Sequence, residues 1–338
     1  MRCKLMKLLI TGGAGFMGSN FIKYILKKHP DWQVVNLDKL TYCGNLENLK
    51  EVSQSSNYTF VKGDIANRED VERAIGDGVD KIINYAAETH VDRSILEPDA
   101  FIKTDVFGTY TLLEAVKKYN VAQYIQISTD EVFGSIKEGS FSEESPFMPN
   151  SPYSASKAGG DHLCRAYFIT YNLPVIITHS CNFYGPNQYP EKLIPLFITN
   201  LLERKKVPVY GKGDQVREWI FTEDHCRAVE FLMEKGRPGE VYNIGTGYEK
   251  QNIETTKFIL NELGFDEDMI ETVKDRPGHD VRYAINSQKL RGLGWKPEVD
   301  WEEGMRRTIS WYKENEAWWK PLKSGEFLEY YRKQYQKA

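Results

Sequence analysis

The sequence of 338 residues predicts an α/β fold, a doubly wound parallel sheet with a smaller C-terminal substrate-binding lobe. Two observations predict it. Through the first half, short apolar runs alternate with helical stretches, and parallel neighbours need a crossover that a helix supplies. After about Gly185, proline and glycine become denser, as in GKGDQVREW, GRPGE and DRPGHD. We therefore expect a first domain at 1–185 and the smaller lobe mainly at 186–338, with later strands of the sheet contributed by the C-terminal half.

The first elements follow from the spacing of apolar residues. KLLIT at 7–11 is predicted to be a buried strand, and a helix at 18–28 follows the glycine turn behind it. QVVNLD at 33–38 and YTFVKGD at 58–64 are predicted to be the next strands, and 68–75 has helical spacing. The crossovers between these strands should be right-handed.

The same alternation continues to the middle of the chain. KIINYAA at 81–87 and QYIQIS at 123–128 are predicted strands, with a helix around 104–118 between them. A helix at 153–171 precedes the strand PVIITHS at 174–180. The aromatic-rich end of the chain is predicted to pack as helices against the smaller lobe.

Composition excludes several classes of protein. Lys and Arg number 44 against 48 Asp and Glu, so the net charge of −4 gives no electrostatic reason to expect a nucleic acid or a membrane as partner. No stretch approaches the roughly 20 apolar residues of a membrane span, and the N-terminal apolar run is shorter than a signal peptide needs. The five cysteines form no CxxC pair. We therefore expect reduced thiols and a cytoplasmic location.

A glycine turn between the first strand and the first helix predicts a dinucleotide site in a Rossmann-type fold. Gly12, Gly15 and Gly18 of TGGAGFMG allow a tight turn and let backbone N–H groups approach a pyrophosphate at the helix N-terminus. Asp38 ends the second strand 20 residues later, where an acid can bind ribose hydroxyls and repel a 2′-phosphate. This favours NAD over NADP, although Lys39 next to the acid weakens the preference.

Five polar residues form a candidate catalytic set. Tyr153 and Lys157 are spaced i, i+4, which puts both side chains on one face of a helix. A nearby ammonium and a cationic nicotinamide would favour the phenolate of the tyrosine. Thr129, Asp130 and Glu131 follow an apolar strand at its carboxyl end, where open α/β sheets build their sites. Two adjacent carboxyl groups suit a general acid and a general base on neighbouring carbons.

Each of these patterns also has a purely structural interpretation. Asp38 could be a solvated strand end, the Asp130–Glu131 pair could cap a helix, and a Tyr–Lys pair is often structural. The combination in one chain favours hydride chemistry. The histidines lack ligand spacing, so no metal site is predicted.

Several longer strings resemble one enzyme family over nearly the full length. They are TGGAGFMGS, AAETHVDRSI, STDEVFG, YSASK, NFYGPNQYPEKLIPL, VYGKGDQVREW and DRPGHDVRYAI. The chain is similar to the extended short-chain dehydrogenases/reductases and, within them, to the dTDP-glucose 4,6-dehydratase family. Asp130 distinguishes this family from its relatives, since related 4-epimerases typically lack the Asp-Glu pair. Related dehydratases and decarboxylases usually have Thr-Ser-Glu.

The resemblance implies an activity and its cofactor. NAD would oxidise C4 of dTDP-glucose while Tyr153 removes the O4 proton. Glu131 would then take the C5 proton, Asp130 would protonate the departing C6 hydroxyl, and the hydride would return to C6. The product, dTDP-4-keto-6-deoxyglucose, leads to deoxysugars of the dTDP-rhamnose type. The resemblance also implies a homodimer through paired helices, with 104–118 and 153–171 as candidates.

The resemblance further implies contacts for cofactor and substrate. Cofactor contacts would be made by Gly12, Gly15, Phe16, Met17, Gly18, Asp38, Lys39, Leu40, Thr41, Asp64, Ile65, Tyr85, Ala86, Ala87, Glu88, Thr104, Tyr153 and Lys157. Substrate contacts would be made by Thr89, Thr129, Asn182, Glu191, Lys192, Leu193, Pro208, Tyr210, Arg217, Asn252, Arg276 and His279. Of these, Arg217 would meet the diphosphate, where a planar guanidinium suits phosphate oxygens.

Two positions depart from the family pattern. Phe183 stands where a second asparagine is usual, so a side-chain contact to the cofactor is lost there. Asp105 stands where an asparagine is common, and a carboxylate cannot donate the hydrogen bonds of an amide. The alternatives left open are another NAD-dependent sugar-nucleotide enzyme, such as a 4-epimerase or decarboxylase, and a catalytically silent NAD-binding module.

Overall fold

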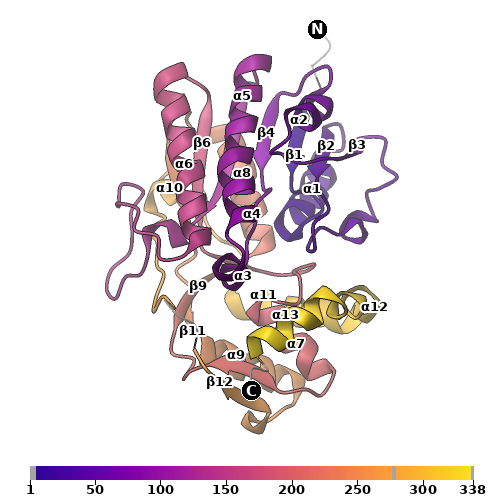
Figure 1. The fold of residues 1–338 in the computed structure, drawn as a ribbon, viewed down its shortest axis with the longest axis vertical. Coiled ribbons are helices and arrows are strands. Elements are labelled where there is room, and N and C mark those ends of the chain that lie inside the picture. The colour runs from indigo at the N-terminus through magenta and orange to yellow at the C-terminus, as the bar shows by residue number, and fades with distance from the viewer. Residues whose placement is uncertain (1–4, 276–278, 336–338) are drawn as a thin grey trace.

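The computed structural model describes residues 5–275 and 279–335 and is organised around a seven-stranded parallel sheet (Figure 1). Every neighbouring pair in this sheet is parallel. The strand order is β10-β6-β5-β4-β1-β2-β3. The strands are β1 (Lys7–Thr11), β2 (Gln33–Asp38), β3 (Tyr58–Lys62), β4 (Lys81–Asn84), β5 (Gln123–Thr129), β6 (Val175–Ser180) and β10 (Val241–Ile244).

Helices cover both faces of the sheet, which confirms the doubly wound α/β prediction. Successive side chains of β1 point to opposite faces of the sheet. Leu8 and Ile10 pack into the core on one face, and Leu9 packs into the core on the other. The first core includes helices α1 (Phe16–Lys28) and α8 (Thr222–Lys235), and the second includes α2 (Arg68–Ile75), α5 (Thr109–Tyr119) and α6 (Pro152–Tyr171). Shorter helices are α3 (Val91–Leu96), α4 (Asp99–Phe101) and α10 (Gln288–Gly292), and a π-helix spans Ile102–Gly108.

A second lobe lies below the carboxyl ends of the large sheet (Figure 1). It contains a three-stranded sheet and a two-stranded one, with a third hydrophobic core between them and their helices. The strands are β7 (Asn182–Tyr184), β8 (Val207–Tyr210), β9 (Val216–Phe221), β11 (Glu249–Gln251) and β12 (Ile270–Val273). The helices are α7 (Leu193–Leu202), α9 (Asn252–Leu263), α11 (Trp301–Glu314), α12 (Glu316–Trp319) and α13 (Glu326–Tyr335).

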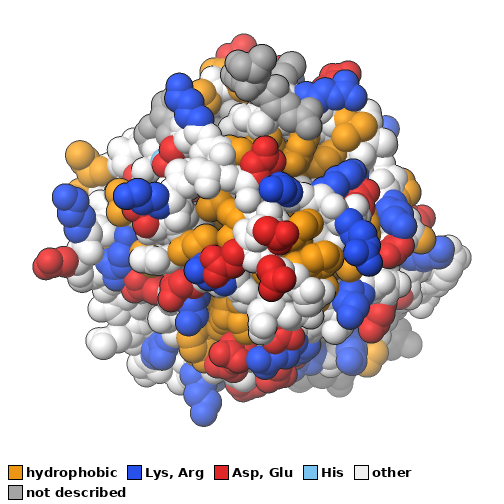
Figure 2. All heavy atoms as spheres, turned by 90° about the horizontal axis from the view of Figure 1, so that it is seen from below, with side chains coloured by type: hydrophobic (Ala, Val, Ile, Leu, Met, Phe, Trp, Pro, Cys, Tyr) orange, Lys and Arg blue, Asp and Glu red, His pale blue; other side chains and the backbone are white. Residues whose placement is uncertain are grey.

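The aromatic C-terminal segment packs against this lobe, as predicted. Trp301, Tyr312 and Trp319 are buried in the third core. On the face seen in Figure 2, acidic and basic side chains are interspersed with small apolar areas. Among the described helices, none combines the length and the apolar character needed to cross a membrane.

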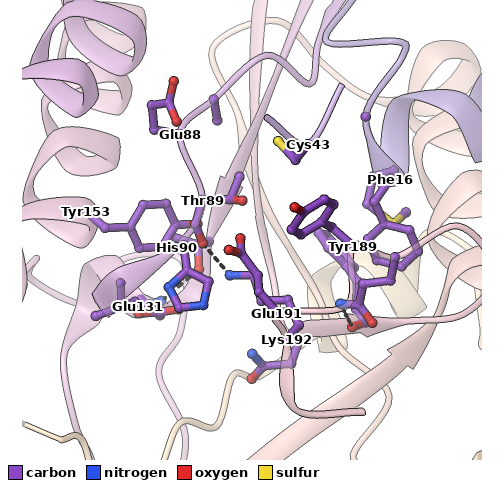
Figure 3. Close-up of a pocket in the computed structure, with 18 of the residues that line it drawn as sticks. Phe16, Cys43, Glu88, Thr89, His90, Glu131, Tyr153, Tyr189, Glu191 and Lys192 are labelled. Carbon is purple, nitrogen blue, oxygen red and sulfur yellow. Dashed lines mark hydrogen bonds between the residues drawn. The ribbon is translucent and has the colours of Figure 1, made fainter. Parts of the chain in front are cut away.

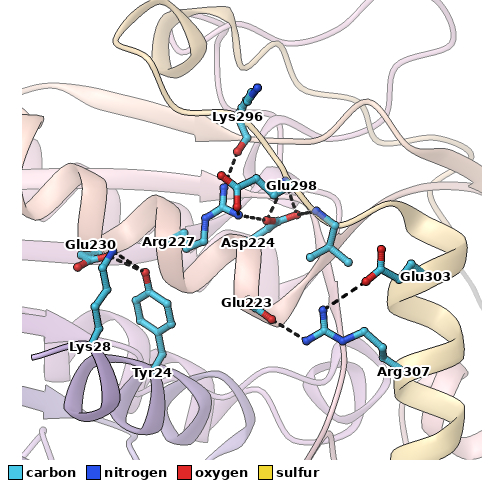
Figure 4. A network of polar contacts seen from close by, with 11 residues as sticks. Tyr24, Lys28, Glu223, Asp224, Arg227, Glu230, Lys296, Glu298, Glu303 and Arg307 are labelled. Carbon is cyan, nitrogen blue, oxygen red and sulfur yellow. Dashed lines mark hydrogen bonds and ion pairs between the residues drawn. The ribbon is translucent and has the colours of Figure 1, made fainter.

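Helix α8 joins the two lobes through polar contacts at both of its ends (Figure 4). Near its C-terminal end, Glu230 accepts hydrogen bonds from Tyr24 Oη at 2.5 Å and from Lys28 Nζ at 2.6 Å, both on α1. Near its N-terminal end, Glu223 pairs with Arg307 of α11 at 2.6 Å. Since α8 and β10 both return to the large sheet after the chain has entered the second lobe, the lobes are interleaved in sequence.

The predicted elements differ from the observed ones mainly at their carboxyl ends. β4 ends at Asn84 instead of residue 87, and β3 ends at Lys62 instead of residue 64. In both cases the chain leaves the sheet where its next residues line the cavity described below. The helix predicted at 104–118 is divided into the π-helix and α5. The division of the chain at residue 185 stays a prediction.

Candidate active site

A cavity of about 380 Å³ lies at the carboxyl ends of the parallel strands, and residues of both lobes line it (Figure 3). It brings together all the residues predicted for catalysis, cofactor and substrate except two. Leu40 does not line it, since this residue turns the chain at φ 58° and its N–H binds Asp38 Oδ1 at 2.8 Å. Arg276 lies outside the described residues.

The glycine turn fits a pyrophosphate. A Cβ on Gly12, whose φ is +65°, would lie 2.6 Å from the Ala86 nitrogen, and a Cβ on Gly18 would lie 2.3 Å from the Gly12 oxygen. Glycine is therefore required at both positions for the turn to pack. Helix α1 begins after Gly15 with no side-chain cap, and residues 15–18 line the cavity. Its first N–H groups are thus available to an anion.

The acid at the end of β2 is positioned for a ribose. Asp38 is only 7% exposed and accepts hydrogen bonds from the backbone of Ala14 and of Leu40, both at 2.8 Å. Burial raises the pKa of this carboxyl group. Lys39 forms an ion pair with Asp64 at 2.8 Å, so its ammonium is already partnered. The preference for NAD over NADP, which Lys39 had weakened, is therefore strengthened.

The acid pair sits in the turn that follows β5. Thr129 caps this turn by accepting the Glu131 N–H at 3.3 Å, and it donates to Asp130 Oδ1 at 3.3 Å. Asp130 is 2% exposed, and its Oδ2 has no hydrogen-bond partner among the described residues. Burial raises the pKa of Asp130 well above its usual range, and the charges of Glu131 and Glu218 add to the effect. This shift favours the protonated form of Asp130, which can act as a proton donor.

The Tyr–Lys pair begins the long helix α6. Ser151 caps this helix, which fixes the first turn where Tyr153 projects into the cavity (Figure 3). Lys157 donates to the Ile127 carbonyl of β5 at 2.7 Å and is 4% exposed. Burial raises the pKa of Tyr153 well above 10, with further contributions from the negative charges of Glu131 and Asp105. Positive charge in the cavity is what would favour its phenolate.

Residues of the second lobe close the cavity from the other side. Glu191 accepts hydrogen bonds from Tyr42 Oη at 2.7 Å and from Arg93 Nε at 3.0 Å. Lys192 donates to the Thr89 carbonyl at 2.5 Å. This contact ties the loop after β4 to the segment that precedes α7.

Arg217 lies deeper in the same wall. It donates to the carbonyls of Val216 and Asp280 at 2.7 and 3.0 Å, and its guanidinium lies 4.3 Å from the centre of the Tyr283 ring. The other predicted substrate residues lining the cavity are Thr89, Asn182, Leu193, Pro208, Tyr210, Asn252 and His279.

Sequence reasoning missed several cavity residues that are brought in by tertiary structure. Tyr283 Oη donates to Asp280 Oδ2 at 2.6 Å and lies 3.5 Å from Glu131 Oε2. Its position inside the string DRPGHDVRYAI could have suggested it. Cys43, Tyr189 and Tyr335 also line the cavity, and no local pattern marks them. In the described part of the chain no three His, Cys, Asp or Glu residues cluster as metal ligands would.

Both departures from the family pattern lie at the site. Phe183 lines the cavity and packs edge-on against His225, with ring centres 4.5 Å apart. Asp105 lies behind the cavity wall, where its carboxylate accepts a hydrogen bond from Ser156 Oγ at 2.6 Å.

Comparison with known proteins agrees with this geometry. The profile of the GDP-mannose 4,6 dehydratase family matches residues 9–308. The dTDP-glucose 4,6-dehydratase of Streptomyces niveus is 48% identical over 324 residues, covering 94% of this chain and 96% of the relative. The low-salt glycan biosynthesis protein Agl12 of Haloferax volcanii is 50% identical over 307 residues, covering 91% and 98%.

A solved structure extends the likeness to the fold. The dTDP-glucose 4,6-dehydratase DesIV of Streptomyces venezuelae, whose crystals contain NAD, is 49% identical with a TM-score of 0.91, covering 94% of this chain and 100% of DesIV. The chain thus belongs to the dTDP-glucose 4,6-dehydratase family of extended short-chain dehydrogenases/reductases.

Proposed function

We propose that the protein is an NAD-dependent hydro-lyase that converts dTDP-glucose to dTDP-4-keto-6-deoxyglucose. The observation that carries the proposal is the buried Asp130 beside Glu131, in the cavity that also holds Tyr153 and Lys157. Elimination of water next to a ketone needs one acid and one base on adjacent carbons. A 4-epimerase needs no proton donor for a C6 hydroxyl.

The cavity fits NAD as the cofactor. The uncapped start of α1 suits the pyrophosphate, Asp38 suits a ribose without a 2′-phosphate, and the walls at Asp64–Ile65 and Tyr85–Glu88 enclose the remainder. When bound, NAD supplies the hydride acceptor for C4 of the sugar and the hydride donor for C6.

The side chains divide the proton transfers between them. Tyr153 accepts the O4 proton, with the ammonium of Lys157 favouring its phenolate. Thr129 lies beside it at the end of β5 to bond the sugar hydroxyl. Glu131 then takes the C5 proton, and Asp130 gives its proton to the departing C6 hydroxyl. The first transfer precedes the other two, because a C4 ketone is what acidifies C5.

Product analysis tests the function directly. Purified protein incubated with dTDP-glucose should yield a product lighter by one water, while UDP-glucose and GDP-mannose are turned over far more slowly. NAD should be released when the protein is denatured, since the cofactor is regenerated in each cycle. Consumption of one NAD per product, or release of NADP alone, contradicts the proposal.

Arg217→Ala should raise the KM for dTDP-glucose by about 10- to 100-fold, because a charge-assisted hydrogen bond is worth about 1.5–3 kcal/mol. The kcat should change less, since a diphosphate contact acts alike in ground and transition states. Steady-state kinetics measure both. Arg282→Ala is the matched control, because Arg282 pairs with Glu249 and does not line the cavity. An unchanged KM in Arg217→Ala would place the diphosphate elsewhere.

We also propose a homodimer formed by the faces of α6 and of the segment that contains the π-helix. The support is four exposed apolar side chains on these elements: Ile102, Phe107, Ile169 and Tyr171, which are 48–63% exposed. Apolar side chains that gather into an exposed patch mark protein–protein contact sites.

We further propose a cytoplasmic location and a place in deoxysugar synthesis of the dTDP-rhamnose type. The free thiols of Cys43, Cys164, Cys181 and Cys226 support a reducing compartment.

Phe107→Asp should dissociate this dimer at micromolar protein concentration, because it buries a charge in an apolar interface. Light scattering after size-exclusion chromatography measures the mass. Leu328→Asp is the control, since Leu328 is 38% exposed on α13 of the second lobe. A monomeric wild type, or a dimer that Phe107→Asp leaves intact, contradicts this arrangement.

A further inference from the structure

Asp105 is a buried carboxyl group that the proposed chemistry does not use. It lies in the π-helix Ile102–Gly108 and is 2% exposed. Its Oδ1 accepts the Glu88 N–H at 3.1 Å, and its Oδ2 accepts Ser156 Oγ at 2.6 Å. Glu88 belongs to the loop that lines the cavity after β4, and Ser156 sits between Tyr153 and Lys157 on α6. The carboxyl group therefore joins the cofactor side of the cavity to the catalytic helix.

No cation in the described part of the chain forms an ion pair with Asp105. The nearest opposite charge, Lys157, faces it but directs its ammonium to the Ile127 carbonyl. Burial without an ion-pair partner favours the protonated form of a carboxyl group, whereas the two hydrogen bonds that Asp105 accepts favour the carboxylate. Burial raises the pKa of Asp105 to about 7, against the lowering effect of Lys157.

The charge on Asp105 acts on the catalytic tyrosine. Ser156 connects the two residues, since its Oγ lies 2.6 Å from Asp105 Oδ2 and 2.8 Å from the Tyr153 carbonyl oxygen. The negative charge of Asp105 raises the pKa of Tyr153, after burial and the charge of Glu131. Two anions, Asp105 and the Tyr153 phenolate, would thus share the single ammonium of Lys157 inside a buried site. Such a pair titrates in a coupled manner, in which ionisation of one group opposes ionisation of the other.

We propose that Asp105 is a positioning residue that controls the ionisation of Tyr153, its carboxyl group being protonated when the tyrosine is a phenolate. The site then carries one negative charge opposite Lys157 at a time. The inference rests on the proposed role of Tyr153 as a base. The charged and titratable groups that face the pair are Lys157 on α6, Glu88 after β4, and Asp130 and Glu131 after β5. Glu88 is in turn faced by Lys39, Asp64, Arg93 and Glu191.

The pH dependence of sugar oxidation tests the proposal. Asp105→Asn keeps the shape of the side chain and removes its charge, so Tyr153 should ionise at lower pH. The rate of NADH formation in a single turnover with dTDP-glucose should rise with pH, which gives the pH–rate profile a rising limb. In Asp105→Asn this limb should lie about one pH unit lower than in the wild type. The wild-type limb should also be shallower, because two coupled groups titrate along it. Identical limbs in the two proteins would overturn the proposal.

Thermal stability gives a readout that does not depend on activity. Because folding raises the pKa of Asp105, the wild type should lose stability relative to Asp105→Asn as the pH rises from about 4 to about 7. The melting temperature of the variant minus that of the wild type should therefore be more positive at pH 8 than at pH 5. A difference that does not change with pH would show that the acid does not titrate in this range.

Two further variants make the test specific. Asp99→Asn removes an exposed acid from the neighbouring helix α4, so it should move neither the limb nor the melting difference. Ser156→Ala removes a hydrogen bond that favours the carboxylate, so it should move the titration of Asp105 to higher pH, and this outcome can be measured even if Asp105→Asn does not fold. Failure of wild-type protein to convert dTDP-glucose would refute the proposed function, whereas the melting experiment tests Asp105 on its own.

Discussion

Glu131→Gln should still reduce bound NAD when given dTDP-glucose, yet form product about 10²–10⁴-fold more slowly than the wild type. An amide cannot accept the C5 proton, whereas oxidation at C4 depends on Tyr153. Enzyme-bound NADH should therefore accumulate, and its absorbance in a single-turnover mixture measures it. The expected split separates elimination from oxidation within one active site.

Asp130→Asn is the matched comparison for this variant, because it removes the proton donor and leaves the base. It should also accumulate NADH, since the C6 hydroxyl leaves poorly without a proton. Elimination at the wild-type rate in Glu131→Gln would show that another group is the base. A folded, NAD-loaded Glu131→Gln that forms no NADH would show that Glu131 is needed for oxidation, which contradicts the proposed division between the two steps.

Tyr153→Phe should instead block the formation of NADH, slowing oxidation by about 10²–10⁴-fold. Phenylalanine keeps the ring in place and removes only the hydroxyl that accepts the O4 proton. Stopped-flow absorbance with dTDP-glucose measures the effect. Tyr167→Phe, on the same helix, is the control, because its hydroxyl bonds Glu114 and does not line the cavity. NADH formation at the wild-type rate in Tyr153→Phe would remove this residue from the first step.

Much of the fold could be predicted because its determinants are local. The strands β1 and β2 and the helix α2 match their predicted ranges, since apolar spacing and a glycine turn define them. The meeting of the candidate catalytic residues in one cavity could be predicted for a related reason: parallel strands place their carboxyl ends at one edge, so residues after β5 and on α6 lie there together.

The parts of the site that could not be predicted depend on contacts between segments far apart in the sequence. The partners of Glu191 come from residues 42 and 93, and Tyr335 reaches the cavity from the last helix. The pairing of Lys39 with Asp64, which strengthens the preference for NAD over NADP, could not be inferred from the neighbouring residues. The departure at Asp105 was visible in the sequence, but its burial without an ion pair was not, because burial is a property of the folded chain.

The return of β10 to the large sheet has a consequence for synthesis of the protein. β6 pairs with β5 on one side and with β10 on the other. Until the segment at residue 241 leaves the ribosome, the N–H and C=O groups along that side of β6 have no strand partner. An unpaired strand edge is a template for aggregation. A nascent chain that pauses within the second lobe thus leaves this side of β6 open to incorrect pairing, and chaperone binding there would protect a side that β10 covers in the folded protein.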